Sequence, residues 1–152
     1  MALRRTQFFA ILLTALALVP GGAHLAELPN KIALGRTDYF VVQHIYNGWA
    51  LFGIILVAAL VANLTHAFLL SRMGRPRGLA VAATIFVIVN LVIFFTWTFP
   101  VNQVTHNWTS VPVNWSALKV QWEYSQAINA VVMFAALVCV TLAVLRQGAP
   151  EA

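Results

Sequence analysis

The sequence contains very little charge. Only 9% of its 152 residues are charged, and four of them are acidic. A soluble domain usually carries about 25% charged residues, so this composition excludes an ordinary soluble domain, a disordered chain and a coiled coil. Hydrophobic residues make up 61% of the chain, and the mean hydropathy is +0.84. Length and composition together predict one integral membrane domain over residues 1–152.

Cysteine is almost absent as well. The single cysteine, Cys139, lies deep in an apolar run, so it forms no intrachain disulfide and is expected to be a small packing residue. The nine basic residues give a formal net charge of +5. They form no stripe with interleaved aromatic residues, and nucleic acid is therefore not an expected partner.

Four apolar runs are long enough to cross a bilayer, which takes about 20 residues. They lie at about 8–26, 39–70, 79–99 and 121–145. None alternates with the period of two of a barrel strand, and only helices satisfy their own backbone groups in lipid. The sequence therefore predicts an all-α fold, a four-helix transmembrane bundle, in which the second and fourth helices exceed the bilayer thickness.

The basic residues are divided unequally between the two ends of these runs. Six lie on one side: Arg4, Arg5, Arg72, Arg75, Arg77 and Arg146. The other side has Lys31, Arg36 and Lys119. The positive-inside rule then places both termini in the cytoplasm and the two longer loops, about 27–38 and 100–120, outside. The expected location is a bacterial inner membrane.

The N-terminal segment can be interpreted either as a membrane span or as a cleavable signal. Residues 1–23 resemble a secretory signal, with Arg4 and Arg5 before an apolar stretch and small residues after it. Cleavage would leave three spans, but we expect the segment to be retained.

The fourth helix is predicted to begin near Asn114, a candidate N-cap, and to reach Arg146. At 1.5 Å per residue it would be about 48 Å long, and would extend above the membrane on the outer side.

Ionisable side chains inside a membrane are expensive and are therefore candidates for function. Most of them fall near the outer ends of the predicted helices, as pairs three residues apart or in the second outer loop. They are His24 with Glu27, His44 with the amide of Asn47, Glu123 with the amide of Gln126, and His106. An antiparallel bundle would bring these groups to one level of the membrane.

Several kinds of chemistry fit this set, and the sequence leaves them open. The four residues His24, Glu27, His44 and His106 are candidate ligands of a transition metal. His24 and His44 are also candidate axial ligands of a haem, or proton acceptors near neutral pH. No known metal-binding spacing is present, so a cofactor-free site, or ion pairs that only lock the helices together, are equally open alternatives.

Aromatic residues gather at the same level. They comprise the segment 94–99 with Trp97, and Trp115 and Trp122 seven residues apart on one helix face. They indicate either an interfacial aromatic belt or a pocket for a flat, lipophilic small molecule.

The segment from Asn107 to Asn129 resembles a known family. It contains Asn107-Trp108-Thr109, Pro112, Trp115, Leu118 and Gln121-Trp122-Glu123-Tyr124. This pattern is similar to the last third of the anthrone oxygenase-like membrane proteins, small four-span proteins that are mostly of unknown function. The outline of the rest of the chain is loosely similar. Members carry a His and an Arg shortly after Trp-Glu, where this chain has Gln126 and Asn129.

The resemblance implies a small membrane oxidoreductase, because a few members oxidise an anthrone to an anthraquinone. In that interpretation Glu123 and His44 are acid–base groups, and His24 and Glu27 orient them or hold a metal. The expected substrate-binding residues are Asn47, Trp97, Asn107, Trp115, Trp122 and Gln126. Two alternatives are a non-enzymatic accessory subunit of a larger membrane complex or homo-oligomer, and a haem- or metal-binding electron carrier.

Overall fold

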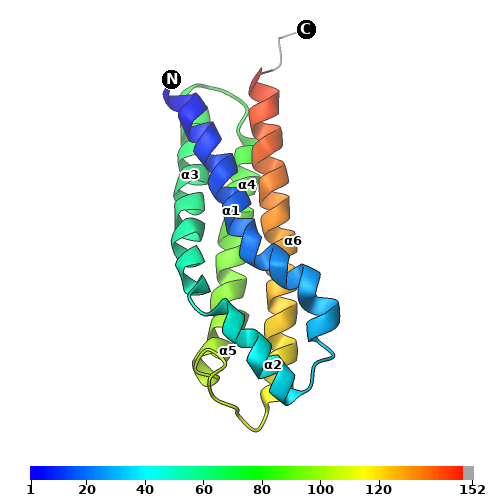
Figure 1. The fold of residues 1–152 in the computed structure, drawn as a ribbon. Coiled ribbons are helices and arrows are strands. Elements are labelled where there is room, and N and C mark those ends of the chain that lie inside the picture. Colours follow the sequence, from blue (N-terminus) through cyan, green and yellow to red (C-terminus); the bar gives the residue numbers. More distant parts are fainter. Residues whose placement is uncertain (149–152) are drawn as a thin grey trace.

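The computed structural model describes residues 1–148, in which all regular elements are helical. Four long helices run side by side, and both the N-terminus and the end of the last helix lie at the same end of the bundle (Figure 1). The elements are α1 (Ala2–Lys31), α2 (Arg36–Gln43), η1 (His44–Tyr46), η2 (Trp49–Leu51), α3 (Phe52–Arg72), α4 (Gly78–Ile93), the π-helical turn η3 (Phe94–Thr98), α5 (Phe99–Val104) and α6 (Trp115–Gly148).

Four helices are long and apolar enough to cross a membrane, as the sequence predicts. They are Ala2–Lys31, Trp49–Arg72, Gly78–Val104 and Trp115–Gln147. The first and third are longer than the apolar runs alone indicate. The last begins where predicted: the backbone carbonyl of Asn114 accepts the amides of Ala117 and Leu118.

The prediction of one continuous helix over about 39–70 is wrong. Helix α2 ends at Gln43, and two 3-10 turns lead to the start of α3 at Phe52. Between these turns Gly48 has a φ of +87°, a left-handed conformation that favours glycine and turns the chain before α3. Helix α2 therefore lies across the end of the bundle instead of continuing α3 (Figure 1).

The bundle is held together by small side chains. Its buried apolar positions are mostly alanine: Ala10, Ala59, Ala62, Ala80, Ala83, Ala127, Ala130, Ala136 and Ala143. A Cβ on Gly21 of α1 would lie 3.3 Å from the Cα of Ala130 on α6, so these helices cross at close range. Small residues at the crossings of membrane helices allow this approach, which van der Waals packing then stabilises.

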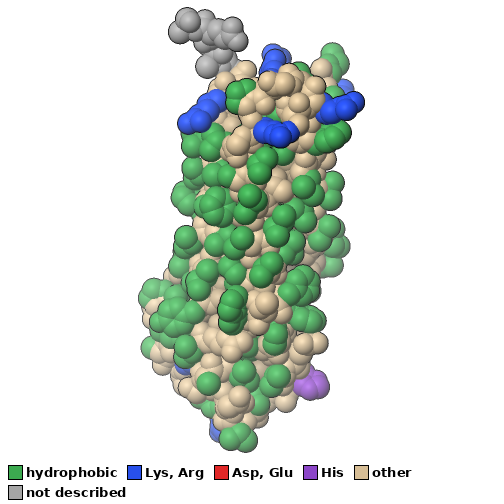
Figure 2. All heavy atoms as spheres, turned by 180° about the vertical axis from the view of Figure 1, so that it is seen from behind, with side chains coloured by type: hydrophobic (Ala, Val, Ile, Leu, Met, Phe, Trp, Pro, Cys, Tyr) green, Lys and Arg blue, Asp and Glu red, His purple; other side chains and the backbone are tan. Residues whose placement is uncertain are grey.

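The outward faces of the helices carry large apolar side chains. Exposed examples are Phe68, Ile54, Val131 and Phe134. Figure 2 shows these side chains covering most of the length of the molecule, with Lys and Arg side chains concentrated at one end. The opposite end is closed by α2, α5 and the loop before α6 (Figure 1).

Candidate acid–base site

Helix α2 covers a buried polar network at the end of the bundle that lies away from the termini. Tyr39 and Gln43, one turn apart on α2, are both buried. The phenol of Tyr39 donates a hydrogen bond of 2.8 Å to Oε1 of Glu123 on α6, and Nε2 of Gln43 donates to the Tyr39 hydroxyl. These bonds fasten α2 to α6.

Glu123 is fully buried, and the last residue of α1 provides its counter-charge. The Nζ atom of Lys31 lies 3.0 Å from Glu123 Oε1, and Lys31 is only 3% exposed. Glu123 Oε2 is buried and has no hydrogen-bond partner among the described residues. Because two buried charges lose their hydration, such a pair stabilises a fold only when further hydrogen bonds accompany it.

Those further bonds extend the network to a second carboxylate. Lys31 Nζ donates to the hydroxyl of Tyr46 at 3.0 Å, and the Tyr46 hydroxyl donates to Oε2 of Glu27. Glu27 Oε2 also lies 3.7 Å from Lys31 Nζ. One ammonium group thus lies between two carboxylates, and the network connects α1, α2, η1 and α6.

Aromatic rings enclose the Lys31 ammonium. Its Nζ atom lies 4.4 Å from the ring centroid of Tyr46 and 5.0 Å from that of Trp122, distances at which a cation is attracted to a ring face. The Trp122 indole donates to Oδ1 of Asn102 at 2.8 Å, which fixes that ring. The rings exclude water and so strengthen the ion pairs around Lys31.

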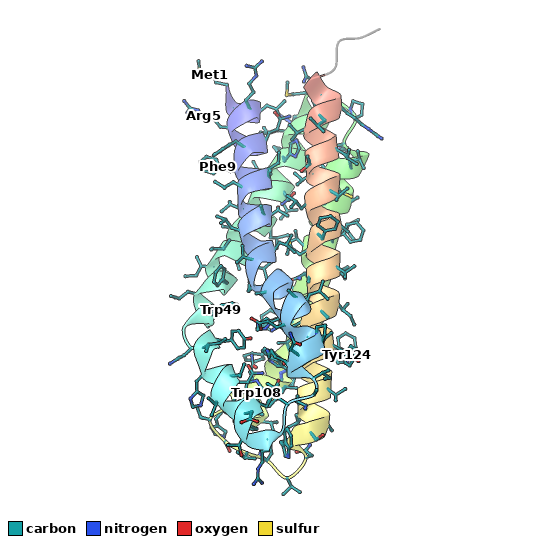
Figure 3. The ribbon with its side chains drawn as sticks, turned by 45° about the vertical axis from the view of Figure 1, so that its right-hand side comes forward. Met1, Arg5, Phe9, Trp49, Trp108 and Tyr124 are labelled. Carbon is teal, nitrogen blue, oxygen red and sulfur yellow. The ribbon has the colours of Figure 1, made fainter. Side chains whose placement is uncertain are left out.

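Trp108 enters the same cluster from the loop between α5 and α6. It is buried, and its ring centroid lies 5.1 Å from that of Tyr39 and 5.9 Å from that of Trp122. Figure 3 shows Trp49 and Trp108 beside α2 at this end of the molecule. His106, Asn107 and Trp108 all have positive φ values, an unfavourable conformation that the loop adopts while it buries Trp108.

Both network tyrosines lie outside the four spans, and both remain protonated. Burial raises the pKa of Tyr39 far above its usual value, and the neighbouring Glu123 carboxylate raises it further. Burial likewise raises the pKa of Tyr46, together with its hydrogen bond to Glu27. The two phenols therefore act as hydrogen-bond donors and not as bases.

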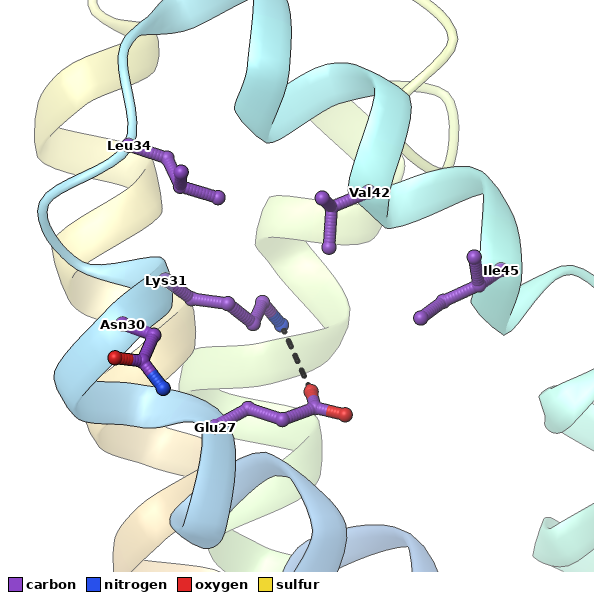
Figure 4. A pocket seen from close by; sticks show the side chains of 6 residues that line it. All are labelled: Glu27, Asn30, Lys31, Leu34, Val42 and Ile45. Carbon is purple, nitrogen blue, oxygen red and sulfur yellow. Dashed lines mark ion pairs between the residues drawn. The ribbon is translucent and has the colours of Figure 1, made fainter.

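A pocket opens beside the network, between the end of α1 and helix α2. Its volume is about 280 Å³, and its lining residues are Glu27, Asn30, Lys31, Leu34, Val42 and Ile45 (Figure 4). One side presents the Glu27 carboxylate, with the largely buried Lys31 side chain next to it, and the other side is aliphatic. This volume is just below the range of about 300–1,000 Å³ for small-molecule sites, so the pocket suits a small ligand.

The structure brings together four of the residues selected from the sequence: His24, Glu27, Trp122 and Glu123. The His24 ring is 3% exposed and packs against the rings of Tyr46, Trp49 and Trp122. Its Nδ1 atom lies 3.9 Å from Glu27 Oε2, which is too long for a hydrogen bond. His24 therefore contributes packing next to Glu27.

The other selected residues lie outside this cluster. His44, Asn47, His106, Asn107 and Trp97 are exposed. Trp115 and Gln126 are half-buried on α6, and Trp115 stacks near the ammonium of Lys119. Of all the selected residues, only Glu27 lines the pocket.

The predicted metal set of His24, Glu27, His44 and His106 does not assemble. Within residues 1–148, no three His, Cys, Asp or Glu side chains are grouped so that they could hold a metal ion. The break at Gly48 explains this result, because it leaves His44 on an exposed 3-10 turn instead of inside a long helix.

Sequence reasoning missed Lys31, Tyr39, Gln43 and Tyr46. The first apolar run ends near residue 26 and so predicts Lys31 in the following loop, whereas α1 continues to Lys31. The spacing of Glu27 and Lys31, four residues apart, was the available signal, since oppositely charged residues at this spacing meet on one helix face.

Comparison of the chain with protein-family models, with curated proteins and with solved structures gives no match in any of the three. The interpretation of the site therefore depends on its geometry.

Proposed function

We propose that the chain is a small membrane oxidoreductase that removes a proton from a flat, lipophilic carbonyl compound and lets the resulting anion react with dioxygen. The observation that carries the proposal is the pairing of Glu27 and Lys31 on one wall of a pocket whose other wall is aliphatic. A carboxylate beside an ammonium group is the arrangement that enolate formation needs: a base for the C–H proton and a positive charge for the developing oxyanion.

The proposed base is Glu27, not His44 or Glu123. Glu27 lines the pocket, and its side chain is 37% exposed, so a ligand reaches it. Its contacts with Tyr46, Lys31 and His24 all use Oε2. Glu123 is fully buried, pairs with the Lys31 ammonium and accepts a hydrogen bond from the Tyr39 hydroxyl.

The reaction balances without a further reductant. With anthrone as the substrate, Glu27 accepts one proton from the methylene carbon while Lys31 stabilises the charge on the carbonyl oxygen. The enolate gives its electron pair to dioxygen, and the peroxide anion formed at that carbon takes the proton back from Glu27 to give a hydroperoxide. Cleavage of the O–O bond, with loss of the second hydrogen of the carbon as water, gives anthraquinone. The sum is anthrone plus dioxygen to anthraquinone plus water.

The test is oxygen uptake and anthraquinone absorbance with purified protein in detergent or liposomes. The wild type should accelerate both above the spontaneous rate, and Glu27→Gln should remove most of the acceleration, since a positioned base contributes about 10²–10⁴-fold. Asp38→Asn is the matched control, because Asp38 is an exposed carboxylate in the first turn of the nearby α2. Equal rates for the two variants would contradict the assignment.

We also propose an orientation in the membrane. The arginine-rich end, with both termini, lies in the cytoplasm of a bacterium, and the acid–base site faces the outer side of the inner membrane. The support is the excess of basic residues at one end of the bundle.

A second candidate function is that of an accessory subunit of a larger membrane complex. The contacts of Lys31 support this candidate, because its ion pair and hydrogen bonds connect α1, α2 and α6 and so have a structural role. In that case a partner should co-purify in stoichiometric amount, and the wild type should not accelerate oxygen uptake above the spontaneous rate.

A further inference from the structure

The end of the bundle that carries the termini is strongly cationic. Six exposed arginines are found there: Arg4, Arg5, Arg72, Arg75, Arg77 and Arg146. Figure 2 shows basic side chains around this end, next to the apolar surface. At the opposite end, Lys31, Arg36 and Lys119 are balanced by Glu27, Asp38 and Glu123. The net positive charge of residues 1–148 is therefore located at one end.

The loop that joins α3 to α4 has a defined conformation. The amide of Arg75 donates to the Leu70 carbonyl at 3.0 Å, the amide of Gly74 donates to the Ser71 carbonyl at 3.1 Å, and Gly74 has a φ of +66°. These features form a tight turn that caps the C-terminus of α3. The turn fixes the backbone from which the loop arginines project.

Two of the loop guanidinium groups are also held by neighbouring side chains. Arg72 lies over the ring of Phe68, at 5.9 Å from its centroid. Arg77 donates a hydrogen bond to the hydroxyl of Ser71. Both contacts leave the guanidinium groups on the surface, so they remain accessible to an anion.

These arginines have no protein counter-charge within residues 1–148. The ion pairs of the described chain are formed at the opposite end, by Lys31 with Glu27 and Glu123. Arginines as close in sequence as Arg72, Arg75 and Arg77 repel one another. An external anion removes that repulsion, and the planar guanidinium group binds phosphate oxygens through two parallel hydrogen bonds.

Large apolar side chains lie directly beside the arginines. Phe8 and Phe9 follow Arg4 and Arg5 by one helical turn, and Phe68 lies under Arg72; all three phenylalanines are exposed. A ligand that fits this surface carries a phosphate next to a long hydrocarbon. A phospholipid has this structure, and a soluble phosphate does not.

We propose that the arginine-rich end of the bundle is a binding surface for the headgroups of anionic phospholipids, with the α3–α4 loop at its centre. The phosphate accepts hydrogen bonds from the loop guanidinium groups, and the acyl chains lie along the exposed phenylalanines. The inference concerns the end of the molecule opposite the acid–base site and is independent of the proposed reaction.

The experiment is native mass spectrometry of the purified wild type with an equimolar mixture of phosphatidylglycerol and phosphatidylcholine of identical acyl chains. The first bound lipid should be phosphatidylglycerol with a preference of at least about fivefold, the size expected for a single juxtamembrane arginine. The triple variant R72Q/R75Q/R77Q should lose most of this preference. R72K/R75K/R77K should keep part of it, because it retains the charge but not the planar donor pair.

Two controls separate this site from general charge effects. Arg36→Gln removes an exposed arginine at the other end and should leave the preference unchanged, and glycerol phosphate at equal concentration should not displace the lipid. The single variant Arg75→Gln repeats the test with one exposed side chain if the triple variant does not fold. A wild-type preference below twofold overturns the proposal. Displacement by glycerol phosphate, or an Arg36→Gln effect as large as that of the loop variants, does so as well.

Discussion

Lys31 is the residue on which the acid–base site depends most. Its ammonium group contacts Glu123, Tyr46 and Glu27, and it is almost completely buried. Lys31→Met should lower the free energy of unfolding by about 3–5 kcal/mol, because it leaves the buried Glu123 carboxylate without a counter-charge. Thermal unfolding in detergent, followed by circular dichroism, measures the loss.

The double variant Lys31→Met/Glu123→Leu isolates the cause of that loss. It removes both charges, so its melting temperature should lie above that of Lys31→Met alone. Glu123→Leu could instead destabilise the Lys31→Met variant as much as it destabilises the wild type. In that case the two charges are not coupled, and the proposed ion pair does not stabilise the fold.

Tyr39 should make the stability of the fold depend on pH in the alkaline range. Its pKa in the fold is raised above the value of about 10 for an unfolded tyrosine. The buried, protonated phenol therefore contributes stability that is fully present below about pH 10 and is lost as the pH rises above that value. Melting temperatures of the wild type should fall between about pH 10 and 11, and Tyr39→Phe should show a shallower fall. Equal slopes would contradict this role of Tyr39.

At the scale of elements, the contact between α1 and α6 depends on Gly21. An alanine Cβ there would lie 3.3 Å from backbone atoms of Ala130, whereas at the adjacent Gly22 it meets nothing within 4 Å. Gly21→Ala should therefore lower the melting temperature relative to Gly22→Ala, although both changes favour the helix by up to about 1 kcal/mol. If the two variants have the same melting temperature, the two helices do not approach as closely as the structure shows.

The position of α2 depends on the turn at Gly48. A side chain at a φ of +87° costs about 1–2 kcal/mol, so Gly48→Ala should destabilise the protein. Gly53→Ala, in α3 and in open space, is the matched control and should be neutral or stabilising. The same thermal assay compares them, and destabilisation by Gly53→Ala alone would contradict the account of the turn.

These elements also show how far hydropathy predicts the fold. Length and apolar composition are sufficient for the four spans, since they depend only on the cost of placing backbone and charge in lipid. Length and composition did not predict α2 as a separate helix. Val41, Val42 and Ile45 make this segment apolar, although it lies across the end of the bundle. The Asn47-Gly48 pair was the local signal for the break, and it was outweighed by the length of the run.

At the scale of the whole molecule, the two ends should lie on opposite sides of a membrane. Cysteines introduced at Thr37 and Val113, in a background where Cys139 is alanine, should react with an impermeant maleimide added to intact cells. A cysteine at Met73 should react only after the membrane is opened. Labelling of Met73→Cys in intact cells would reverse the proposed orientation.

The candidate site was less predictable than the fold. Glu27, Glu123, His24 and Trp122 were selected correctly as neighbours because they fall at one level of the predicted bundle. His44 lies on the surface and Lys31 inside the network. Helix boundaries and rotations decide which polar residues face inward, and an almost uniformly apolar sequence does not specify them.

In the proposed reaction Glu27, beside Lys31, removes a proton from a flat carbonyl compound. Hydrogen–deuterium exchange of the anthrone methylene protons in D₂O under argon measures this step alone, without dioxygen. The wild type and Asp38→Asn should accelerate the exchange above the spontaneous rate, and Glu27→Gln should not. Exchange at the spontaneous rate with folded wild-type protein, or undiminished exchange with Glu27→Gln, would contradict the proposed role of Glu27.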